Sequence, residues 1–215
     1  SLVKGLEFDL AKAALNLSGI EPVISQVFSI DDIESKFKSS SSLAAIASVK
    51  GMRQDYFYSE SFVRFQDMVV TRKEDHLLIE NTSSLVGKNV GAWFSAYKNL
   101  GKDYYAKFNP AANPVNYVEY KDQYQQIRDF VDNKLDVIVI DKTIFFWVLR
   151  QIAPNRVEYY KYDYIFAQDP GYRVAFKDRR LRDKFNKNLA KIKESGLYQQ
   201  IVTDYSNGTA YAKKN

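Results

Sequence analysis

The chain has 215 residues, 46% of them hydrophobic and 27% charged, an ordinary globular composition for one large domain or two of roughly 100 residues each. It contains no cysteine, which excludes disulfides, thiolate metal sites and a cysteine nucleophile. No apolar run approaches the roughly 20 residues of a membrane span. The net charge is +5, but Lys and Arg are interleaved with Asp and Glu, so nucleic-acid binding is not expected.

The first part of the sequence predicts helices that alternate with short strands. Residues 5–17 predict a turn that leads into a helix, with Asp9 as the N-cap of the helix and Gly19 beyond its end. A second helix is expected after Asp31 or Asp32, either of which suits an N-cap. Strands are expected at Pro22–Phe28, Leu43–Ala47 and Met68–Thr71, and residues 85–93 predict a turn that leads to another strand.

Residues 115–151 give the clearest pattern. A strand at Val115–Tyr120 precedes a helix with apolar residues at three- and four-residue spacing. Leu135–Ile140 is then a near-continuous apolar strand, as expected where both faces of a parallel strand are covered, and Asp141 ends it before another apolar helix. This strand–helix–strand–helix series predicts an α/β sheet. A strand at Arg173–Phe176 and helices at 180–194 and Leu197–Tyr205 complete the series.

Three segments in this order resemble the bacterial family of extracellular solute-binding proteins for polar amino acids. Gly5-Leu-Glu-Phe-Asp9-Leu-Ala resembles that family's Gly-Phe-Asp-x-Asp-Leu entry to its first helix. Lys134-Leu-Asp136-Val-Ile-Val-Ile-Asp141 is similar to its Gly-Lys/Arg-hydrophobic-Asp-Ala-apolar-Asp element. Ala175-Phe-Lys177 and Leu181 to Tyr198 follow its closing pattern of strand, long helix, Gly-x-Tyr and short helix.

The resemblance implies a two-lobed type II periplasmic binding protein-like α/β fold, in which two open, mostly parallel sheets are joined by two crossover strands. Lobe one is expected to combine residues 1–67 and 168–215, and lobe two to span 68–167, with the ligand cleft between them. The crossovers are expected near Asp67–Val70 and Phe166–Asp169. Only four residues precede Gly5, so we expect the family's first strand to be missing here or supplied differently.

Two charged residues match positions at which the family holds its ligand. Arg53 falls where the family has an arginine that clamps the ligand's α-carboxylate, and a guanidinium fork suits that group. Ser48 is expected to replace a hydroxyl donor that the family has just ahead of this arginine. Asp141 falls where a family aspartate takes the ligand's α-ammonium, although an aspartate before a helix is equally suited to be its N-cap.

Other candidate ligand contacts are aromatic or hydroxyl side chains. Trp93 to Tyr97 occupies the lobe-two loop where the family has Gly-Ser/Thr and offers backbone N–H groups, which predicts a different or bulkier solute. Ser95 is expected to contribute a hydroxyl. Phe28 or Ile30 falls where the family stacks a phenyl ring on the ligand, and core packing is the alternative for each aromatic residue.

The resemblance implies a non-enzymatic, monomeric, periplasmic or membrane-tethered receptor without cofactor or metal. It is expected to capture a polar amino acid or similar small solute by hinge closure and to deliver it to a membrane ABC permease. The alternative is the ligand-sensing domain of a signalling system with the same fold. An enzyme is the third possibility, but the sequence offers no recognisable acid–base pair, and His76 is its only histidine.

Overall fold

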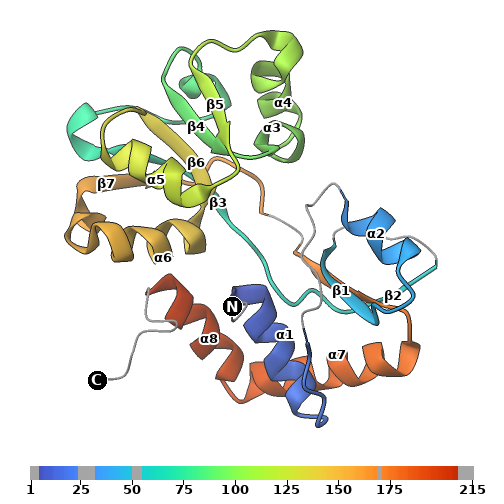
Figure 1. Cartoon of the computed structure of the whole chain (residues 1–215). Helices are drawn as coiled ribbons and strands as arrows, with labels where there is room; N and C mark the ends of the chain where they lie inside the picture. The colour runs from blue at the N-terminus through green and yellow to red at the C-terminus, as the bar shows by residue number, and fades with distance from the viewer. Residues whose placement is uncertain (1–4, 24–31, 50–54, 169–170, 208–215) are drawn as a thin grey trace. The chain divides into compact units, whose positions relative to one another are not determined.

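The computed structural model describes residues 5–23, 32–49, 55–168 and 171–207, which form two compact units (Figure 1). Unit 1 comprises residues 1–64 and 169–203, and unit 2 comprises residues 65–168 and 204–215. Unit 1 is therefore assembled from segments on both sides of residues 65–168, the main part of unit 2. Asp67–Arg72, close to one expected crossover, is a strand inside the sheet of unit 2. The ligand cleft expected between two lobes stays a prediction.

Unit 1 contains a small sheet with helices packed against it. Its three strands are in the order β1-β8-β2, and both pairs are antiparallel. The resemblance implied mostly parallel strands, whereas both described strand pairs of this small sheet are antiparallel. The elements are α1 (Leu6–Asn16), α2 (Ile33–Ser39), β1 (Ala45–Val49), β2 (Phe57–Tyr58), β8 (Arg173–Phe176), α7 (Arg179–Glu194) and α8 (Leu197–Ser206), whose last residues belong to unit 2.

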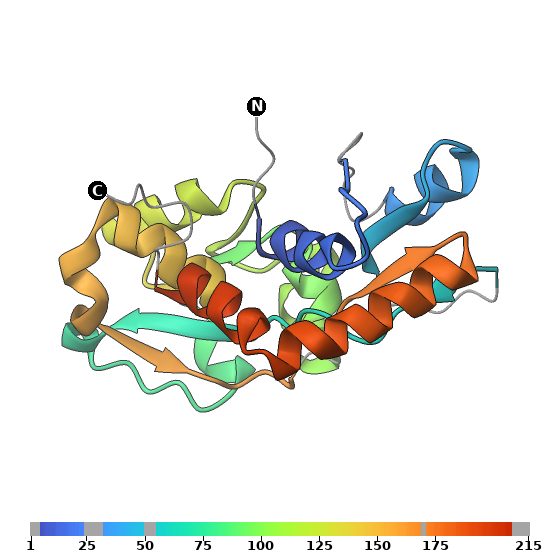
Figure 2. The ribbon, with the colours of Figure 1, turned by 90° about the horizontal axis from the view of Figure 1, so that it is seen from below.

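Helices α1 and α7 lie side by side in unit 1 (Figure 2). Leu10 of α1 and Phe185 of α7 are fully buried. Asn188 of α7 is only 4% exposed, and its amide donates hydrogen bonds to the Ala14 carbonyl at 2.8 Å and to the Ser18 hydroxyl at 2.7 Å. This polar contact fixes the end of α1 against the middle of α7.

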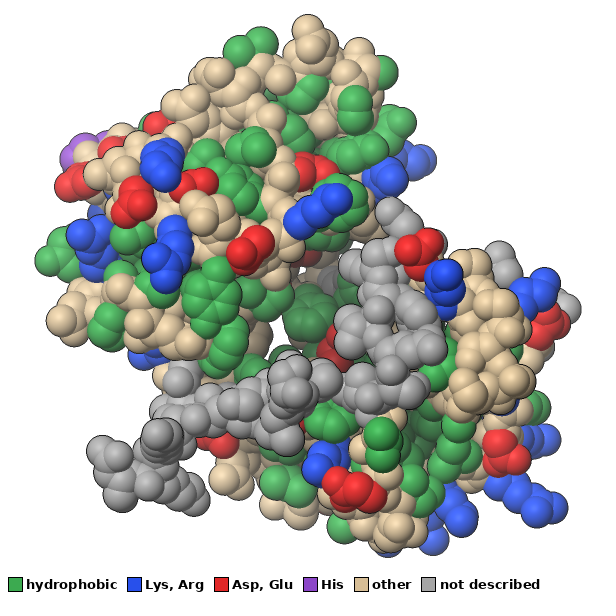
Figure 3. Space-filling view, in the orientation of Figure 1, with side chains coloured by type: hydrophobic (Ala, Val, Ile, Leu, Met, Phe, Trp, Pro, Cys, Tyr) green, Lys and Arg blue, Asp and Glu red, His purple; other side chains and the backbone are tan. Residues whose placement is uncertain are grey.

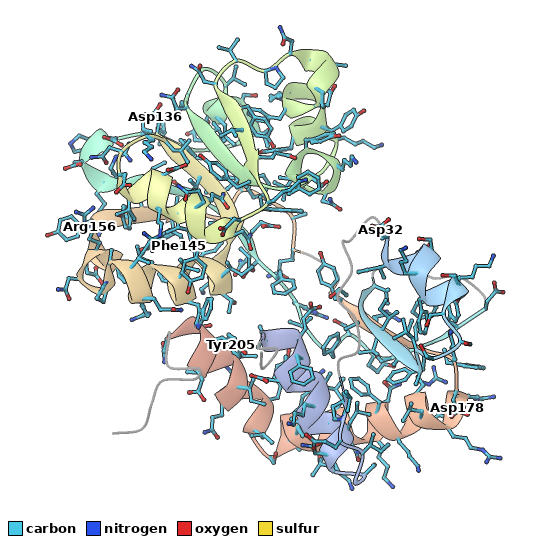
Figure 4. The ribbon with its side chains drawn as sticks, in the orientation of Figure 1. Asp32, Asp136, Phe145, Arg156, Asp178 and Tyr205 are labelled. Atoms are coloured by element: carbon cyan, nitrogen blue, oxygen red, sulfur yellow. The ribbon has the colours of Figure 1, made fainter. Side chains whose placement is uncertain are left out.

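The two long helices of unit 1 begin differently. Asp178 caps α7, since its carboxylate accepts the Leu181 N–H at 2.7 Å (Figure 4). Asp9, expected to cap α1, instead lies inside the first turn of that helix, and Gly5 holds the N-cap position. The helix begins four residues earlier because Leu6 is buried in line with Leu10.

Unit 2 is built on a five-stranded sheet in the order β5-β4-β6-β3-β7. Strands β5, β4 and β6 are parallel, whereas β3 runs antiparallel to β6 and β7 on either side of it. The β5–α5–β6–α6 series confirms the pattern of residues 115–151. The strands are β3 (Asp67–Arg72), β4 (Val90–Trp93), β5 (Tyr117–Tyr120), β6 (Val137–Asp141) and β7 (Tyr160–Asp163), and the helices are η1 (Lys73–Asp75), η2 (Thr82–Leu85), α3 (Ala96–Asn99), α4 (Lys102–Phe108), η3 (Pro110–Ala112), α5 (Gln123–Val131), α6 (Lys142–Ile152) and η4 (Pro154–Tyr159).

Both faces of this sheet are covered, which explains the uninterrupted apolar sequence of β6. Ile138 and Ile140 pack in a cluster with Phe145 of α6, which Figure 4 labels. Val139 lies in a second cluster with Tyr104 of α4 on the other face. Successive side chains of a strand point to opposite faces, so every residue of β6 is buried. No helix among the described residues has the length and apolar character needed to cross a membrane.

Candidate functional site

The carboxyl ends of β4, β5 and β6 lie at one edge of the unit 2 sheet. The last residues of these adjacent parallel strands are Trp93, Tyr120 and Asp141. Ligands of open α/β sheets bind beyond the carboxyl ends of the strands, so this edge is the candidate functional site of unit 2. Three residues singled out from the sequence, namely Trp93, Ser95 and Asp141, are positioned by it.

Asp141 is almost fully buried and uses both of its carboxylate oxygens within unit 2. Oδ1 accepts the Ile144 N–H at 3.0 Å, which makes Asp141 the N-cap of α6. Oδ2 accepts the Gln66 N–H at 2.8 Å. Burial raises the pKa of the Asp141 carboxyl to about 6, although three backbone N–H groups and nearby Lys142 act in the opposite direction. Both roles weighed for Asp141 therefore involve one carboxylate: the N-cap is observed, and the ligand contact stays a prediction.

Ser95 lies between β4 and α3 in a left-handed conformation with φ of 68°. Its side chain is largely buried, with 8% of the residue exposed. The Ser95 N–H donates to Oε2 of Glu119 at 2.7 Å, and the Tyr97 N–H donates to Oε1 of the same residue at 3.0 Å. This loop lies where the family resembled by the sequence offers backbone N–H groups, and here two of them are directed to a carboxylate of the same chain.

Glu119 was not identified from the sequence. It lies on β5, whose pairing with β4 brings its side chain to the β4–α3 loop. Tyr117, two residues earlier on the same face of the strand, donates its hydroxyl to Glu119 Oε1 at 2.8 Å. The only available sequence signal was a glutamate two residues after a tyrosine in a predicted strand, and its partner depends on the strand order.

Tyr117, which donates to this carboxylate, belongs to a cluster of aromatic side chains. Tyr117 stacks on Phe108 with ring centroids 4.7 Å apart, and the Tyr104 hydroxyl lies 3.5 Å from that of Tyr117. Burial raises the pKa of both tyrosine hydroxyls, so they remain protonated donors at neutral pH. Trp93 is half-buried, and its buried Nε1 has no hydrogen-bond partner among the described residues. Phe94 is 44% exposed.

In unit 1 the structure shows that Ser48, one of the predicted ligand contacts, has Glu7 as its hydrogen-bond partner. Ser48, at the end of β1, has a φ of 65° and donates its hydroxyl to Glu7 Oε2 at 2.5 Å. Burial raises the pKa of the Glu7 carboxyl, while the hydrogen bond from Ser48 acts in the opposite direction. Oε1 of Glu7 is buried without a hydrogen-bond partner in the described part of the chain. Arg53 and Phe28, the other predicted contacts of this unit, lie outside the described residues.

The described residues contain no group of three His, Cys, Asp or Glu side chains placed to hold a metal ion. His76 is exposed, and Figure 3 shows the histidine side chain, in purple, on the surface beside acidic and basic side chains. Its backbone is left-handed, at the end of η1.

Comparison with known proteins gives matches at the level of structure. No protein-family model matches the sequence, and no curated protein matches it. An ABC uptake transporter substrate-binding protein from Streptococcus pneumoniae, solved with bound histidine, is 21% identical with a TM-score of 0.66 over 94% of this chain and 82% of its own. An ancestral cationic amino acid solute-binding protein is 15% identical with a TM-score of 0.69 over 94% of this chain and 85% of its own.

A histidine kinase sensor domain with similarity to periplasmic binding proteins is also similar, at 17% identity and a TM-score of 0.66 over 94% of this chain and 85% of its own. At these identities the likeness shows the fold. The chain has the two-unit α/β fold of the type II periplasmic binding proteins, which confirms the predicted fold class.

Proposed function

We propose that this chain is an extracytoplasmic solute-binding protein that captures a polar amino acid or a similar small solute for an ABC uptake transporter. The observation that carries the proposal is the likeness, over 94% of the chain, to structures of proteins named for amino acid binding and uptake. A fold alone does not set a function, so the residues at the strand ends of unit 2 and near Ser48 provide the second line of support.

In this proposal Arg53 holds the solute's carboxylate and Asp141 accepts its ammonium group. The Asp141 carboxylate already interacts with the backbone N–H groups of Ile144, Gln66 and Thr143, so a solute ammonium would use the acceptor capacity that these groups leave. A nearby ammonium lowers the pKa of a buried carboxyl, so solute binding favours the ionised form of Asp141. Ser48, Ser95, Trp93 and Phe28 complete the proposed contacts, and the mature protein acts as a monomer outside the cytoplasm.

A thermal-shift screen of the 20 amino acids and related polar solutes tests the proposal. A solute at 100 times its Kd stabilises the folded chain by about 2.7 kcal/mol, which is a readily measured rise in Tm. For each solute that binds, Arg53→Ala and Asp141→Asn should weaken binding at least tenfold. The matched controls are Arg128→Ala and Asp132→Asn, which replace exposed residues of α5 and its C-terminus and should leave the affinity unchanged. Unchanged affinity in both site variants would exclude this site.

A sensor is the second candidate function, and the similarity to the histidine kinase sensor domain favours it. The same solute capture would then report to a signalling domain rather than to a permease. A pull-down with the solute-loaded protein distinguishes the two, because a transport function predicts co-purification of an ABC permease that the solute-free protein does not retain.

A further inference from the structure

The carboxylate of Glu119 accepts hydrogen bonds from backbone N–H groups at one strand end of the candidate site. Its two carboxylate oxygens accept the N–H groups of Ser95 and Tyr97 at 2.7 and 3.0 Å. The Tyr117 hydroxyl adds a third hydrogen bond at 2.8 Å, and the Tyr104 hydroxyl lies behind that of Tyr117. Hydrogen bonds to a carboxylate are about twice as strong as neutral ones. Glu119 is thus held by its own chain on several sides.

This arrangement changes what the strand ends of unit 2 can accept. Backbone N–H groups in such a loop are suitable donors to an anionic group. Here a carboxylate already takes them, and a solute carboxylate would have to displace it at the cost of three hydrogen bonds. It would also come close to the negative charge of Glu119 itself, which is unfavourable in a half-buried environment.

The adjacent strand end has the same character. Asp141 at the end of β6 is a second carboxylate whose oxygens accept backbone N–H groups. Two lysines of this edge lie over exposed rings: Lys121 Nζ is 5.2 Å from the ring centroid of Phe94, and Lys142 Nζ is 5.8 Å from that of Tyr164. The backbone N–H groups at these two strand ends are thus directed to carboxylates of the chain itself, whereas the two lysines contact aromatic rings.

We propose that Glu119 takes the position of a solute carboxylate in unit 2, so that unit 2 binds the positively charged or uncharged part of the solute. Glu119 is then a specificity-determining residue. The consequence for the solute rests on the proposed function: a carboxylate, where the solute has one, is held from unit 1 alone, and acidic solutes are rejected.

The first test needs no knowledge of the solute. Sodium acetate is titrated into ¹⁵N-labelled wild-type protein, Glu119→Ala and Glu80→Ala, a control at an exposed glutamate elsewhere in unit 2. The amide signals of Ser95 and Tyr97 should show saturable shifts only in Glu119→Ala, because acetate then replaces the missing carboxylate. Equal shifts in all three proteins, or none in Glu119→Ala, would overturn the proposal.

Glu119→Gln provides a second measurement if the alanine variant does not fold. Glutamine keeps the side-chain volume but has a single acceptor oxygen, so one of the two N–H groups loses its partner. Hydrogen exchange of the Ser95 or Tyr97 amide should become at least tenfold faster, whereas exchange in the β3–β6 ladder should not change. Unchanged protection of both amides would contradict the assigned role of Glu119.

The second test uses any amino acid that binds, paired with the amine formed by its decarboxylation. Glu119→Ala leaves the N–H groups of Ser95 and Tyr97 without their acceptor. The preference for binding the amino acid over its amine should therefore rise at least tenfold relative to the wild type. A ratio that stays within twofold would refute the proposal. If no solute binds the wild type, the proposed uptake function fails, and the acetate titration still decides the role of Glu119.

Discussion

The carboxylate of Asp141 accepts the backbone N–H of Gln66, 75 residues earlier in the chain, at 2.8 Å. The Gln66 carbonyl in turn accepts the Lys142 N–H at 2.9 Å. These bonds hold the segment just before β3 against the start of α6. Asp141 therefore stabilises unit 2 whether or not it also binds a solute, and loss of binding in a variant of Asp141 must be interpreted together with its stability.

We expect Asp141→Ala to lower the free energy of unfolding by about 2–4 kcal/mol, because it removes an N-cap and leaves the N–H of the half-buried Gln66 without its acceptor. The measurement is urea denaturation at pH 7. Asp178→Ala removes the exposed cap of α7 and should cost only about 1 kcal/mol. Equal losses in the two variants would contradict a structural role of the Gln66 contact.

The buried Asp141 carboxyl should make stability depend on pH. Its pKa is raised by burial from an ordinary 3.8 to about 6 in the folded chain. Between these values the folded chain binds the proton more tightly than the unfolded chain, so the free energy of unfolding falls as pH rises from about 4 to about 6. The contribution is about 3 kcal/mol at most.

Urea denaturation at several pH values, compared between the wild type and Asp141→Asn, measures the contribution of the Asp141 carboxyl to the pH dependence of stability. The stability difference between the two proteins should shift in favour of Asp141→Asn as the pH rises through this window and should be constant above it. A difference that is independent of pH from 4 to 7 would show that Asp141 titrates alike in the folded and unfolded chains.

Ser48 combines a hydrogen bond to Glu7 with a left-handed backbone. Ser48→Ala should lower the free energy of unfolding by about 1.5–3 kcal/mol, the usual worth of a hydrogen bond to a charged group. Ser48→Gly loses the same bond but relieves the backbone, so it should be more stable than Ser48→Ala by about 1 kcal/mol. Ser35→Ala, an exposed serine with a local bond, is the control. The reverse order of the alanine and glycine variants would refute the backbone argument.

Asn188 is the buried polar contact between α7 and the end of α1. Replacement by leucine leaves the Ala14 carbonyl and the Ser18 hydroxyl without this donor and should lower the free energy of unfolding by about 1–3 kcal/mol. Lys187→Leu makes the matched change at the exposed neighbouring position of α7 and should change stability by less than about 0.5 kcal/mol. Thermal unfolding followed by circular dichroism compares them, and similar losses would argue against the Asn188 contact.

Local sequence was sufficient for most of the elements. The four-residue apolar spacing of α7 and the unbroken apolar run of β6 reflect burial on one side of a helix and on both faces of a strand. The helix around Leu10 was also expected, but its beginning was misplaced because Asp9 is a good cap by residue type, whereas the burial of Leu6 is a tertiary contact. Element type depends on short-range periodicity, whereas boundaries depend on packing partners.

The same distinction between local pattern and tertiary contact applies to the candidate site. The sequence alone determined that Asp141 follows a buried strand and precedes a helix, because both facts are local. Only the tertiary structure decided that Gln66 takes one of its oxygens and that Glu119 fills the donors of Ser95 and Tyr97. These contacts join residues 22 to 75 positions apart, and they depend on strand order and direction, which side-chain periodicity does not encode.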